Sequence, residues 1–323
     1  MELILLCAGR SHDKSGPSGI CFAQAPTDLM YRPKDRALPL SSAPFSPFGA
    51  EDAAHVARFT NVQSRRLRVQ ARSLLWFGLQ SLYGLYGQHA WGRCPDNLPD
   101  GLPATLSGLT LHHDCLGRPS FSDARLQCSI SYAKDQVFCL LGLTEHGAFP
   151  RLGLDCEELR FNSLPPLSML SQREQQELFL FLQLQAQTKK NTSSLSDQSP
   201  GQENELCQKT LASSCLRRWC VREALLKAHG TGLRLNPSSL DGGFLWQRCG
   251  MQHIEGHRYA WRCLALQGLW VCLAIEEQDR ALLHRVRLVR VDRADMQNMV
   301  HRLDRTDVPG VPDMAEGTVA ADS

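Results

Sequence analysis

The chain has 323 residues, of which 43% are hydrophobic and 21% are charged, and its formal net charge is +2. This length exceeds that of one ordinary domain, and the apolar content is enough for sizeable cores. The near-neutral charge argues against a protein that binds nucleic acid over a broad basic surface, so any anion-binding site must be local.

The N-terminal residues MELILLCAGR contain a short apolar run without the preceding basic region of a signal peptide. The apolar runs of the sequence are shorter than the roughly 20 residues that a helix needs to span a bilayer. We therefore expect a cytoplasmic protein with neither a membrane nor a nucleic acid as its partner.

The thirteen cysteines include no C-x-x-C pair, and several lie inside apolar runs, such as Cys139 and Cys272. Buried cysteines of this kind behave as small hydrophobic side chains. We expect reduced, structural cysteines rather than a zinc site or a disulfide framework.

The first half of the chain begins with a segment rich in Pro, Ser and Gly at 9–50, which we expect to form loops. From Ala53 to about Gly87, apolar residues recur at helical spacing, and this predicts a single helix. One face of that helix is basic, with Arg65, Arg66, Arg68 and Arg72. The segments 109–121 and 126–143 then have the composition of strands.

The second half repeats this general plan without a residue-level repeat. The predicted elements are, in order, a strand at 151–159, a helix at 173–187, a helix at 215–229, two strands around a turn at 267–268 and a strand at 284–291. A polar segment at 188–208 is expected to be a flexible insertion. We therefore predict an α+β fold of two similar halves, residues 1–145 and 146–295, followed by a partly disordered tail at 296–323.

Two carboxylates stand out on the strand predicted at 151–159. Asp155 and Glu157 are two positions apart, so both side chains point to the same face of the strand. Two neighbouring carboxylates repel each other unless a cation or solvent relieves the repulsion. Taken alone, this pair is better explained as a solvated strand end with adjacent acids.

A second pair lies on the helix predicted at 215–229. Glu223 and Lys227 are four residues apart on one helical face, with Trp219 one turn earlier. Taken alone, this arrangement is an ordinary surface ion pair, which contributes only tenths of a kcal/mol. The combination of the two pairs, in this order along the chain, is more informative than either.

These residues resemble the motifs of the Sfp-type 4′-phosphopantetheinyl transferases. That family has G-[IVL]-D-x-E, where this chain has GLDCE at 153–157. Further along it has an aromatic residue, [KR]-E-[AS] and a lysine, which correspond here to WCVREALLK at 219–227, followed by GTGL at 230–233. Upstream, GRP at 117–119 and SISYA at 129–133 correspond to the family's G-[KR]-P and N-[IL]-S-H-[ST]. The resemblance covers roughly residues 53–275.

The resemblance implies an enzyme, a 4′-phosphopantetheinyl transferase (holo-[acyl-carrier-protein] synthase). Such an enzyme moves the 4′-phosphopantetheine group of coenzyme A to a serine of an apo acyl- or peptidyl-carrier protein in fatty acid, polyketide or nonribosomal peptide biosynthesis, and it releases adenosine 3′,5′-bisphosphate. It also implies a monomeric pseudo-dimer with the active site between its halves. The alternative is a non-catalytic relative that binds coenzyme A or a carrier protein.

The same resemblance assigns roles to individual residues. Asp155, Glu157 and Glu223 would be Mg²⁺ ligands, because Mg²⁺ prefers hard carboxylate oxygens. Glu223 would also be the general base, and Lys227 would offset the charge of the phosphate and the leaving group. Coenzyme A would be held by Arg66, Arg118, Ser131, Tyr132 and Lys227, several of them through charge-assisted hydrogen bonds.

Tyr132 is the clearest departure from the family pattern, which has a histidine at this position. A phenol stays neutral at ordinary pH and offers one hydrogen bond, whereas an imidazolium would also supply a charge. We therefore expect this exchange to weaken the binding of a coenzyme A phosphate.

Overall fold

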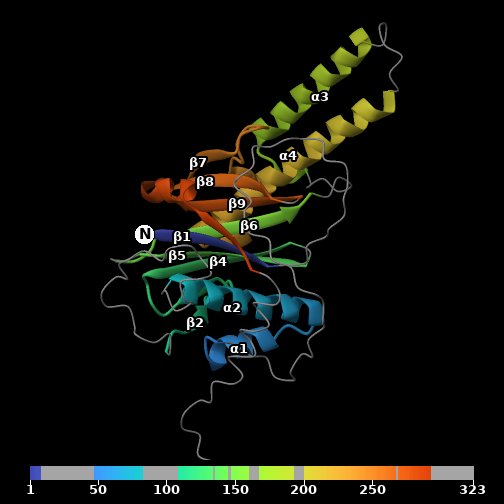
Figure 1. Cartoon of the computed structure of the whole chain (residues 1–323). Coiled ribbons are helices and arrows are strands. Elements are labelled where there is room, and N and C mark those ends of the chain that lie inside the picture. Colours follow the sequence, from blue (N-terminus) through green and yellow to red (C-terminus); the bar gives the residue numbers. More distant parts are fainter. Residues whose placement is uncertain are drawn as a thin grey trace, which may run out of the picture.

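The computed structural model describes residues 1–8, 47–82, 108–133, 135–144, 147–159, 167–192, 200–266 and 268–291. In these ranges the chain has an α+β fold, as the sequence predicted, with two four-stranded sheets stacked face to face between two long helices (Figure 1). Nearly all of the segment 9–50 and all of the tail at 296–323 lie outside the described residues.

The helices and strands have the following bounds. The α-helices are α1 (Ala50–Ala57), α2 (Val62–Leu82), α3 (Gln172–Thr192) and α4 (Pro200–His229). The strands are β1 (Glu2–Ala8), β2 (Leu111–His113), β3 (Pro119–Phe121), β4 (Leu126–Ala133), β5 (Gln136–Leu143), β6 (Leu152–Glu158), β7 (Cys249–Ile254), β8 (His257–Leu266), β9 (Leu269–Glu276) and β10 (Arg287–Arg290). A 3-10 helix at Glu277–His284 joins β9 to β10.

The first sheet has the strand order β10-β1-β5-β4. Its outer face packs on α2, and Gly78 allows a close approach there, because a Cβ at this position would lie 2.4 Å from Cδ1 of Leu6 on β1. The C-terminal strand β10 pairs in parallel with β1, so this sheet takes a strand from beyond the boundary expected at residue 145.

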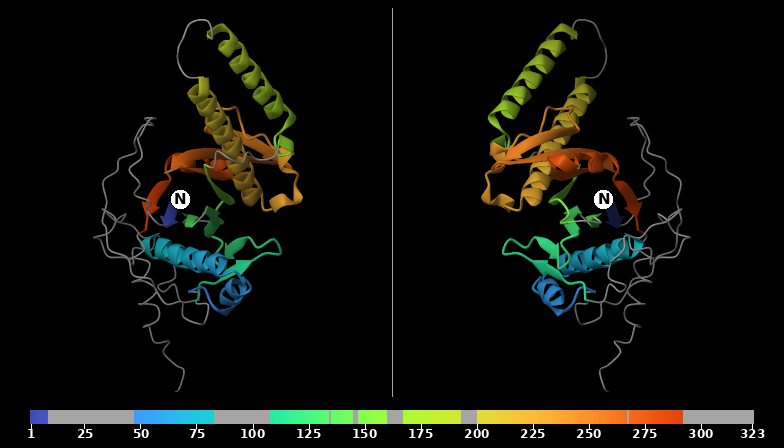
Figure 2. Two further views of the ribbon diagram at one scale, coloured as in Figure 1. Left: turned by 90° about the vertical axis from the view of Figure 1, so that its right-hand side faces the viewer. Right: turned by 90° about the vertical axis from the view of Figure 1, so that its left-hand side faces the viewer.

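The second sheet has the strand order β6-β9-β8-β7, and α4 covers its outer face. Its inner face packs against the first sheet through an apolar layer that includes Leu5, Leu140, Leu154 and Val271. The resulting order of layers is α2, first sheet, second sheet and α4 (Figure 2).

The edge strands β4 and β6 of the two sheets are joined by serine side chains. The backbone N–H of Leu154 donates to Oγ of Ser129 at 2.9 Å, and the N–H of Cys156 donates to Oγ of Ser131 at 3.2 Å. Ser129 and Ser131 are two residues apart on β4, so both side chains point to the same side of the strand. Their hydroxyl groups therefore continue the hydrogen bonding of the first sheet across to β6. The candidate site lies at this junction.

Where the structure describes the segment 53–87, the predicted single helix is two helices, α1 and α2, and residues 83–87 lie outside the described residues. The two helices are separate because Asn61, just before α2, caps the N-terminus of that helix. Its side-chain Oδ1 accepts from the N–H of Ser64 at 2.9 Å. Asparagine favours such helix N-termini over helix interiors, which explains the break within an otherwise periodic sequence.

The flexible insertion predicted at 188–208 is also wrong for the described residues, which are helical. Residues 188–192 complete α3 and 200–208 begin α4, while 193–199 lie outside the described residues. The two helices extend from the body as a hairpin (Figure 2). A small apolar cluster of Leu178 on α3 with Leu211 and Cys215 on α4 packs the base of the hairpin. Ion pairs of Arg222 with Glu174 and of Arg218 with Glu177 flank this cluster.

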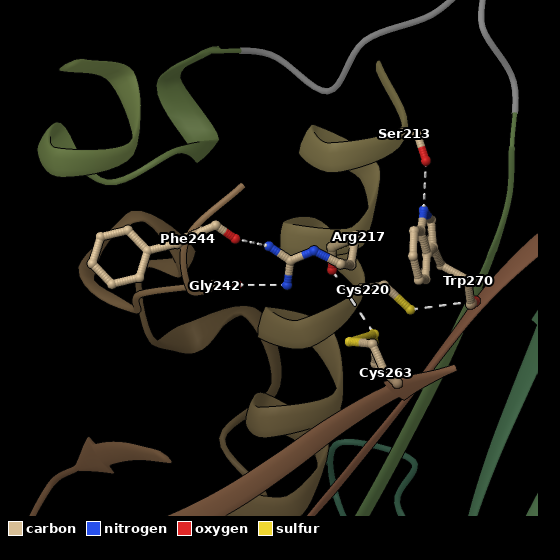
Figure 3. The surroundings of a disulfide bond; sticks show 8 residues. Ser213, Arg217, Cys220, Gly242, Phe244, Cys263 and Trp270 are labelled. Atoms are coloured by element: carbon tan, nitrogen blue, oxygen red, sulfur yellow. Dashed lines mark hydrogen bonds between the residues drawn. A yellow bond between two sulfur atoms is a disulfide. The ribbon is translucent and has the colours of Figure 1, made fainter. Parts of the chain in front are cut away.

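A disulfide joins Cys263 and Cys272, opposite each other on β8 and β9, so the expectation of uniformly reduced cysteines is wrong at this pair. Figure 3 shows its surroundings against α4, where Sγ of Cys220 contacts the carbonyl of Trp270 at 3.5 Å. In the same region Arg217 donates to the carbonyl of Gly242 at 3.0 Å, so the cysteines lie in a densely packed part of the core.

The helices of the described part of the chain lack the combination of length and apolar character that crossing a bilayer requires.

Candidate functional site

Asp155 is the central residue of the candidate site. It lies on β6 with only 5% of its surface exposed. Its Oδ1 accepts from Oγ of Ser131 at 2.9 Å and from Nζ of Lys227 at 2.8 Å. Its Oδ2 is buried and has no hydrogen-bond partner among the described residues. A buried carboxylate oxygen without a donor is costly, so this atom is poised for a ligand.

Lys227 connects three structural elements at this point. Its ammonium group donates to Asp155, to the carbonyl of Leu154 at 3.0 Å and to Oγ of Ser131 at 3.3 Å. The surrounding carboxylates, Asp155 above all, outweigh the effect of burial, so the pKa of Lys227 is raised and the side chain stays charged. In this structure Lys227 is the counter-charge of Asp155.

Glu157 on β6 and Glu223 on α4 interact electrostatically with Asp155. Burial, and after it the charges of Asp155 and Glu223, raise the pKa of Glu157 from 4.5 to about 7, against the lowering effects of Lys227 and Trp219. Burial and Asp155 also raise the pKa of Glu223, with Lys227 partly offsetting the rise. Asp155 is therefore close enough to both glutamates to oppose their ionisation, and Glu223 also opposes that of Glu157.

The structure brings Asp155, Ser131 and Lys227 into direct contact, and Glu157 and Glu223 interact with them electrostatically. Within the described ranges, however, no three histidine, cysteine, aspartate or glutamate side chains stand together as a group that could hold a metal ion. The acids interact electrostatically without forming a ready set of three ligands.

Close packing of β6 on α4 fixes the position of the Asp155 side chain relative to Lys227. A Cβ on Gly153 would lie 1.8 Å from the carbonyl oxygen of Ala224 and 2.6 Å from the nitrogen of Ala228. Only glycine fits there, and the resulting contact brings Asp155 within reach of Lys227. On the other side of α4, the fully buried Arg222 donates to the carbonyls of Pro237 and Leu240 and pairs with Glu174, which fixes the rotation of the helix that carries Glu223.

Tyr132 lies on the opposite face of β4 from Ser131, because successive side chains of a strand alternate. It packs against α2, where the guanidinium of Arg68 lies 5.3 Å from its ring centroid. Burial raises the pKa of the Tyr132 phenol to about 12, against the lowering effect of Arg72 and Arg68. Tyr132 therefore does not join the group around Asp155.

The arginines that reach Tyr132 are Arg68 and Arg72, which are one turn apart on α2. Arg66 is half-buried on another face of the same helix, because a displacement of two residues is roughly 200° of rotation. The basic face was visible in the sequence, but its orientation was not.

Arg118 follows the turn between β2 and β3 and reaches the second half of the molecule. Its Nη1 would lie 2.8 Å from a Cβ on Gly230, the residue after α4. Gly230 also has a φ of +89°, a conformation that favours glycine. The turn is held by Asp114, whose Oδ1 accepts from the N–H of Arg118 and of Leu116, each at 2.8 Å. Arg118 therefore lies near the end of the helix that carries Lys227.

The sequence matches no protein-family model and no curated protein.

Proposed function

We propose that the chain transfers the 4′-phosphopantetheine group of coenzyme A to a serine of an apo acyl- or peptidyl-carrier protein, and that it acts as a monomer in the cytoplasm. In this proposal the two sheet-and-helix halves are the two parts of a pseudo-dimer, with the reaction at the junction of β4 and β6. The observation that carries the proposal is the environment of Asp155, where a buried carboxylate with one unpartnered oxygen is flanked by Glu157, Glu223 and Lys227.

The residues present suit Mg²⁺ in their chemistry. Asp155, Glu157 and Glu223 offer the hard carboxylate oxygens that this ion prefers. The pKa values of Glu157 and Glu223 are raised by burial and by the neighbouring Asp155, and a bound cation would relieve both effects. When bound, the ion supplies charge neutralisation at the diphosphate of coenzyme A. The proposal requires side-chain movement, because the three acids do not form a ligand group as they stand.

The chain's own residues have separate tasks in the proposed reaction. Glu223 accepts the proton of the attacking serine hydroxyl at a carboxylate oxygen, a role that its raised pKa favours near neutral pH. Lys227, which stays protonated, offsets the negative charge of the departing adenosine 3′,5′-bisphosphate. Ser131 orients both Lys227 and Asp155 through its hydroxyl. Arg118 would contact a phosphate of coenzyme A.

The test is to incubate the protein with coenzyme A, Mg²⁺ and several apo-carrier proteins, and to measure the mass of each carrier. We expect at least one carrier to gain the mass of a phosphopantetheinyl group, and we expect EDTA to prevent this. Binding of coenzyme A without modification of any carrier would instead support the non-catalytic alternative. Failure to bind coenzyme A would overturn the transfer proposal, and failure to bind any apo-carrier protein as well would overturn the alternative.

A further inference from the structure

One face of α3 packs on α4, and a neighbouring face of the same helix is exposed and apolar. On the first face Leu178 is buried in an apolar cluster with Leu211 of α4, and Phe181 packs against that cluster. On the second face Phe179 and Leu182 are 60% and 45% exposed. Because α3 and α4 project together from the two sheets (Figure 1), the body of the molecule leaves this second face open.

The exposed face has the residue spacing of a seam between two helices. Phe179, Leu182 and Ala186 follow each other at intervals of three and four residues, and Ala186 is exposed as well. At about 100° per residue, Leu182 and Phe179 lie about 40° and about 100° around the helix axis from Leu178. The seam is therefore roughly a quarter turn from the face that contacts α4. In a four-helix bundle each helix packs on two neighbours that are about a quarter turn apart.

The surface around this seam is uncharged. Within the described residues 172–187, the charged side chains are Arg173, Glu174 and Glu177, and all three form ion pairs inside their own chain. Exposed glutamines, Gln176 and Gln183, border the seam instead. A different partner protein selected by charge would need charges at these bordering positions. A glutamine amide both donates and accepts hydrogen bonds, so it can pair with a copy of itself.

We infer that two copies of this chain pair through α3, antiparallel and related by a two-fold axis near residues 180–181. This alignment sets Phe179 of each copy opposite Leu182 of the other, and the two hairpins together form a four-helix bundle. The antiparallel direction keeps the two bodies at opposite ends of the bundle. The seam offers two large apolar side chains per copy, so it buries less than the roughly 800 Å² per partner of a standard stable interface. We therefore expect a weak dimer, with a Kd on the order of 10 μM.

The pairing of hairpins is independent of the proposed reaction. Asp155, Glu223 and Lys227 of a single chain supply the proposed chemistry, so each copy remains a complete catalytic unit that acts alone at its own site. Lys227 is near the C-terminal end of α4, at the opposite end from the projecting part of that helix. Loss of the dimer should therefore leave the transfer rate per chain unchanged, and a failure of the transfer proposal leaves the dimer untouched.

The test is sedimentation equilibrium of the full chain at concentrations from about 1 to about 200 μM, on both sides of the expected Kd. The mean mass should rise from 36.1 kDa, the mass of one chain, toward twice that value. A mass of one chain at the highest concentration would overturn the proposal. A mass that continues to rise beyond two chains would also overturn it, because a two-fold pair is closed.

Three single variants locate the seam. Phe179→Gln and Leu182→Gln should each raise the Kd about tenfold, because each change removes an apolar side chain from both copies. The matched control is Leu180→Gln, since Leu180 is 58% exposed but lies roughly 130° around the helix from the seam. It should change the Kd less than about twofold. All three side chains are at the surface, so the variants should fold, and thermal denaturation checks this. Equal effects of the three changes would overturn the seam.

Two charge variants test the antiparallel pairing of identical copies. One chain carries Gln176→Lys with Gln183→Lys, and the other carries Gln176→Glu with Gln183→Glu. In the antiparallel pair Gln176 of one copy lies beside Gln183 of the other, so each doubly substituted chain repels its own copy and attracts the other variant. Each variant alone should have the mass of one chain, and an equal mixture should regain the dimer. Parent-like pairing of either variant alone, or no pairing in the mixture, would overturn the proposed alignment.

Discussion

Lys227 holds Asp155 across the junction of α4 and β6, with 2.8 Å between Nζ and Oδ1, and the same Nζ binds the carbonyl of Leu154 at 3.0 Å. The pair thus joins the helix to both the side chain and the backbone of the strand. Because Asp155 is buried, removal of either partner changes the charge balance of the whole site.

The charge of Asp155 is tested by Asp155→Asn, which keeps the shape of the side chain. We expect the transfer rate to fall at least a hundredfold, about 3 kcal/mol, as when one key electrostatic group is removed from an active site. Single-turnover mass measurement of the carrier gives the rate. The control is Glu158→Gln on the same strand, since position 158 points to the opposite face and should leave the rate within about twofold. Full activity in Asp155→Asn contradicts the assignment.

The protonation of Glu157 predicts a pH dependence of stability. Its pKa is about 7 in the folded chain against an ordinary value of 4.5, so the folded state binds the proton more tightly than the unfolded state. The free energy of unfolding should therefore decrease as the pH rises from 4.5 to 7. Glu157→Gln should raise Tm at pH 8 and change it little at pH 4.

Magnesium binding can be followed in the same thermal measurement without any activity assay. Mg²⁺ should raise the Tm of the parent chain at pH 8 more than at pH 5, because ionised carboxylates bind it and protonated ones do not. Asp155→Asn should remove most of this rise. An equal rise at both pH values, or in the variant, would count against a carboxylate site.

The contact at Gly153 is tested by comparison with Gly78. Gly153→Ala places a Cβ against the backbone carbonyl of Ala224, which can move only if α4 moves, so we expect a loss of about 3 kcal/mol in the free energy of unfolding. Gly78→Ala meets the end of the flexible Leu6 side chain and should cost about 1 kcal/mol or less. Urea denaturation measures both. A smaller loss for Gly153→Ala than for Gly78→Ala would contradict the packing argument.

Asp52 anchors α1 to α2 and to β2. This fully buried carboxylate forms a bidentate contact with Arg72, at 3.0 and 2.7 Å for Nε and Nη2, and lies 2.8 Å from Nε2 of His113. The ring of His113 stacks on His55 with centroids 3.7 Å apart. Asp52→Ala leaves Arg72 buried without its partner, so we expect a loss of about 4 kcal/mol in stability.

The double variant Asp52→Leu, Arg72→Met serves as the control for this anchor. It removes both charges together and should be clearly more stable than Asp52→Ala, because no uncompensated charge remains buried. Urea denaturation of the two proteins gives the difference. If both lose the same stability, the cost comes from packing and not from the charge left on Arg72.

Tyr132→His tests whether the family's histidine would gain a charge in this chain. Arg68 and Arg72 surround the position, so they should lower the pKa of an imidazole there and keep it neutral. We expect the affinity for coenzyme A, measured calorimetrically between pH 5.5 and 8, to show no gain at low pH. A gain below about pH 6.5, the ordinary pKa of histidine, would show instead that the substituted ring protonates and meets a phosphate.

The expectation that Asp155, Glu157, Glu223 and Lys227 share one site came from the resemblance of the motifs to a family, whereas local patterns predicted only the α+β class and the pairs Asp155–Glu157 and Glu223–Lys227. These predictions depend on strand alternation and on i,i+4 spacing, which are properties of single elements. The choice between Arg66 and Arg68 depends on how α2 is rotated against the first sheet, which no local pattern contains.

The sequence did not predict the N-terminal part of α4 as a helix, because the contacts that stabilise this helix are made with residues far away in the sequence. The segment 200–214 has no strong apolar stripe, and the helix is held at its base by buried contacts with residues far away in the sequence, such as Glu174 and Glu177. The Cys263–Cys272 disulfide was likewise not predictable, since the composition of β8 and β9 is that of any buried hairpin and only the register sets the two cysteines opposite each other.

Because β10 pairs in parallel with β1, the chain cannot be shortened or split into its two halves without exposing the edge of β1. Leu6 pairs with Val289, and the N–H of Val291 donates to the carbonyl of Cys7 at 2.9 Å, so the last described strand shields the edge of the first. A shortened chain ending before Arg287 would expose the backbone of β1 as a free edge, which invites pairing with other molecules and aggregation. The N-terminal half expressed alone would have the same defect. The chain is therefore expected to fold as one cooperative unit, with its first strand protected only after nearly the whole protein has been synthesised.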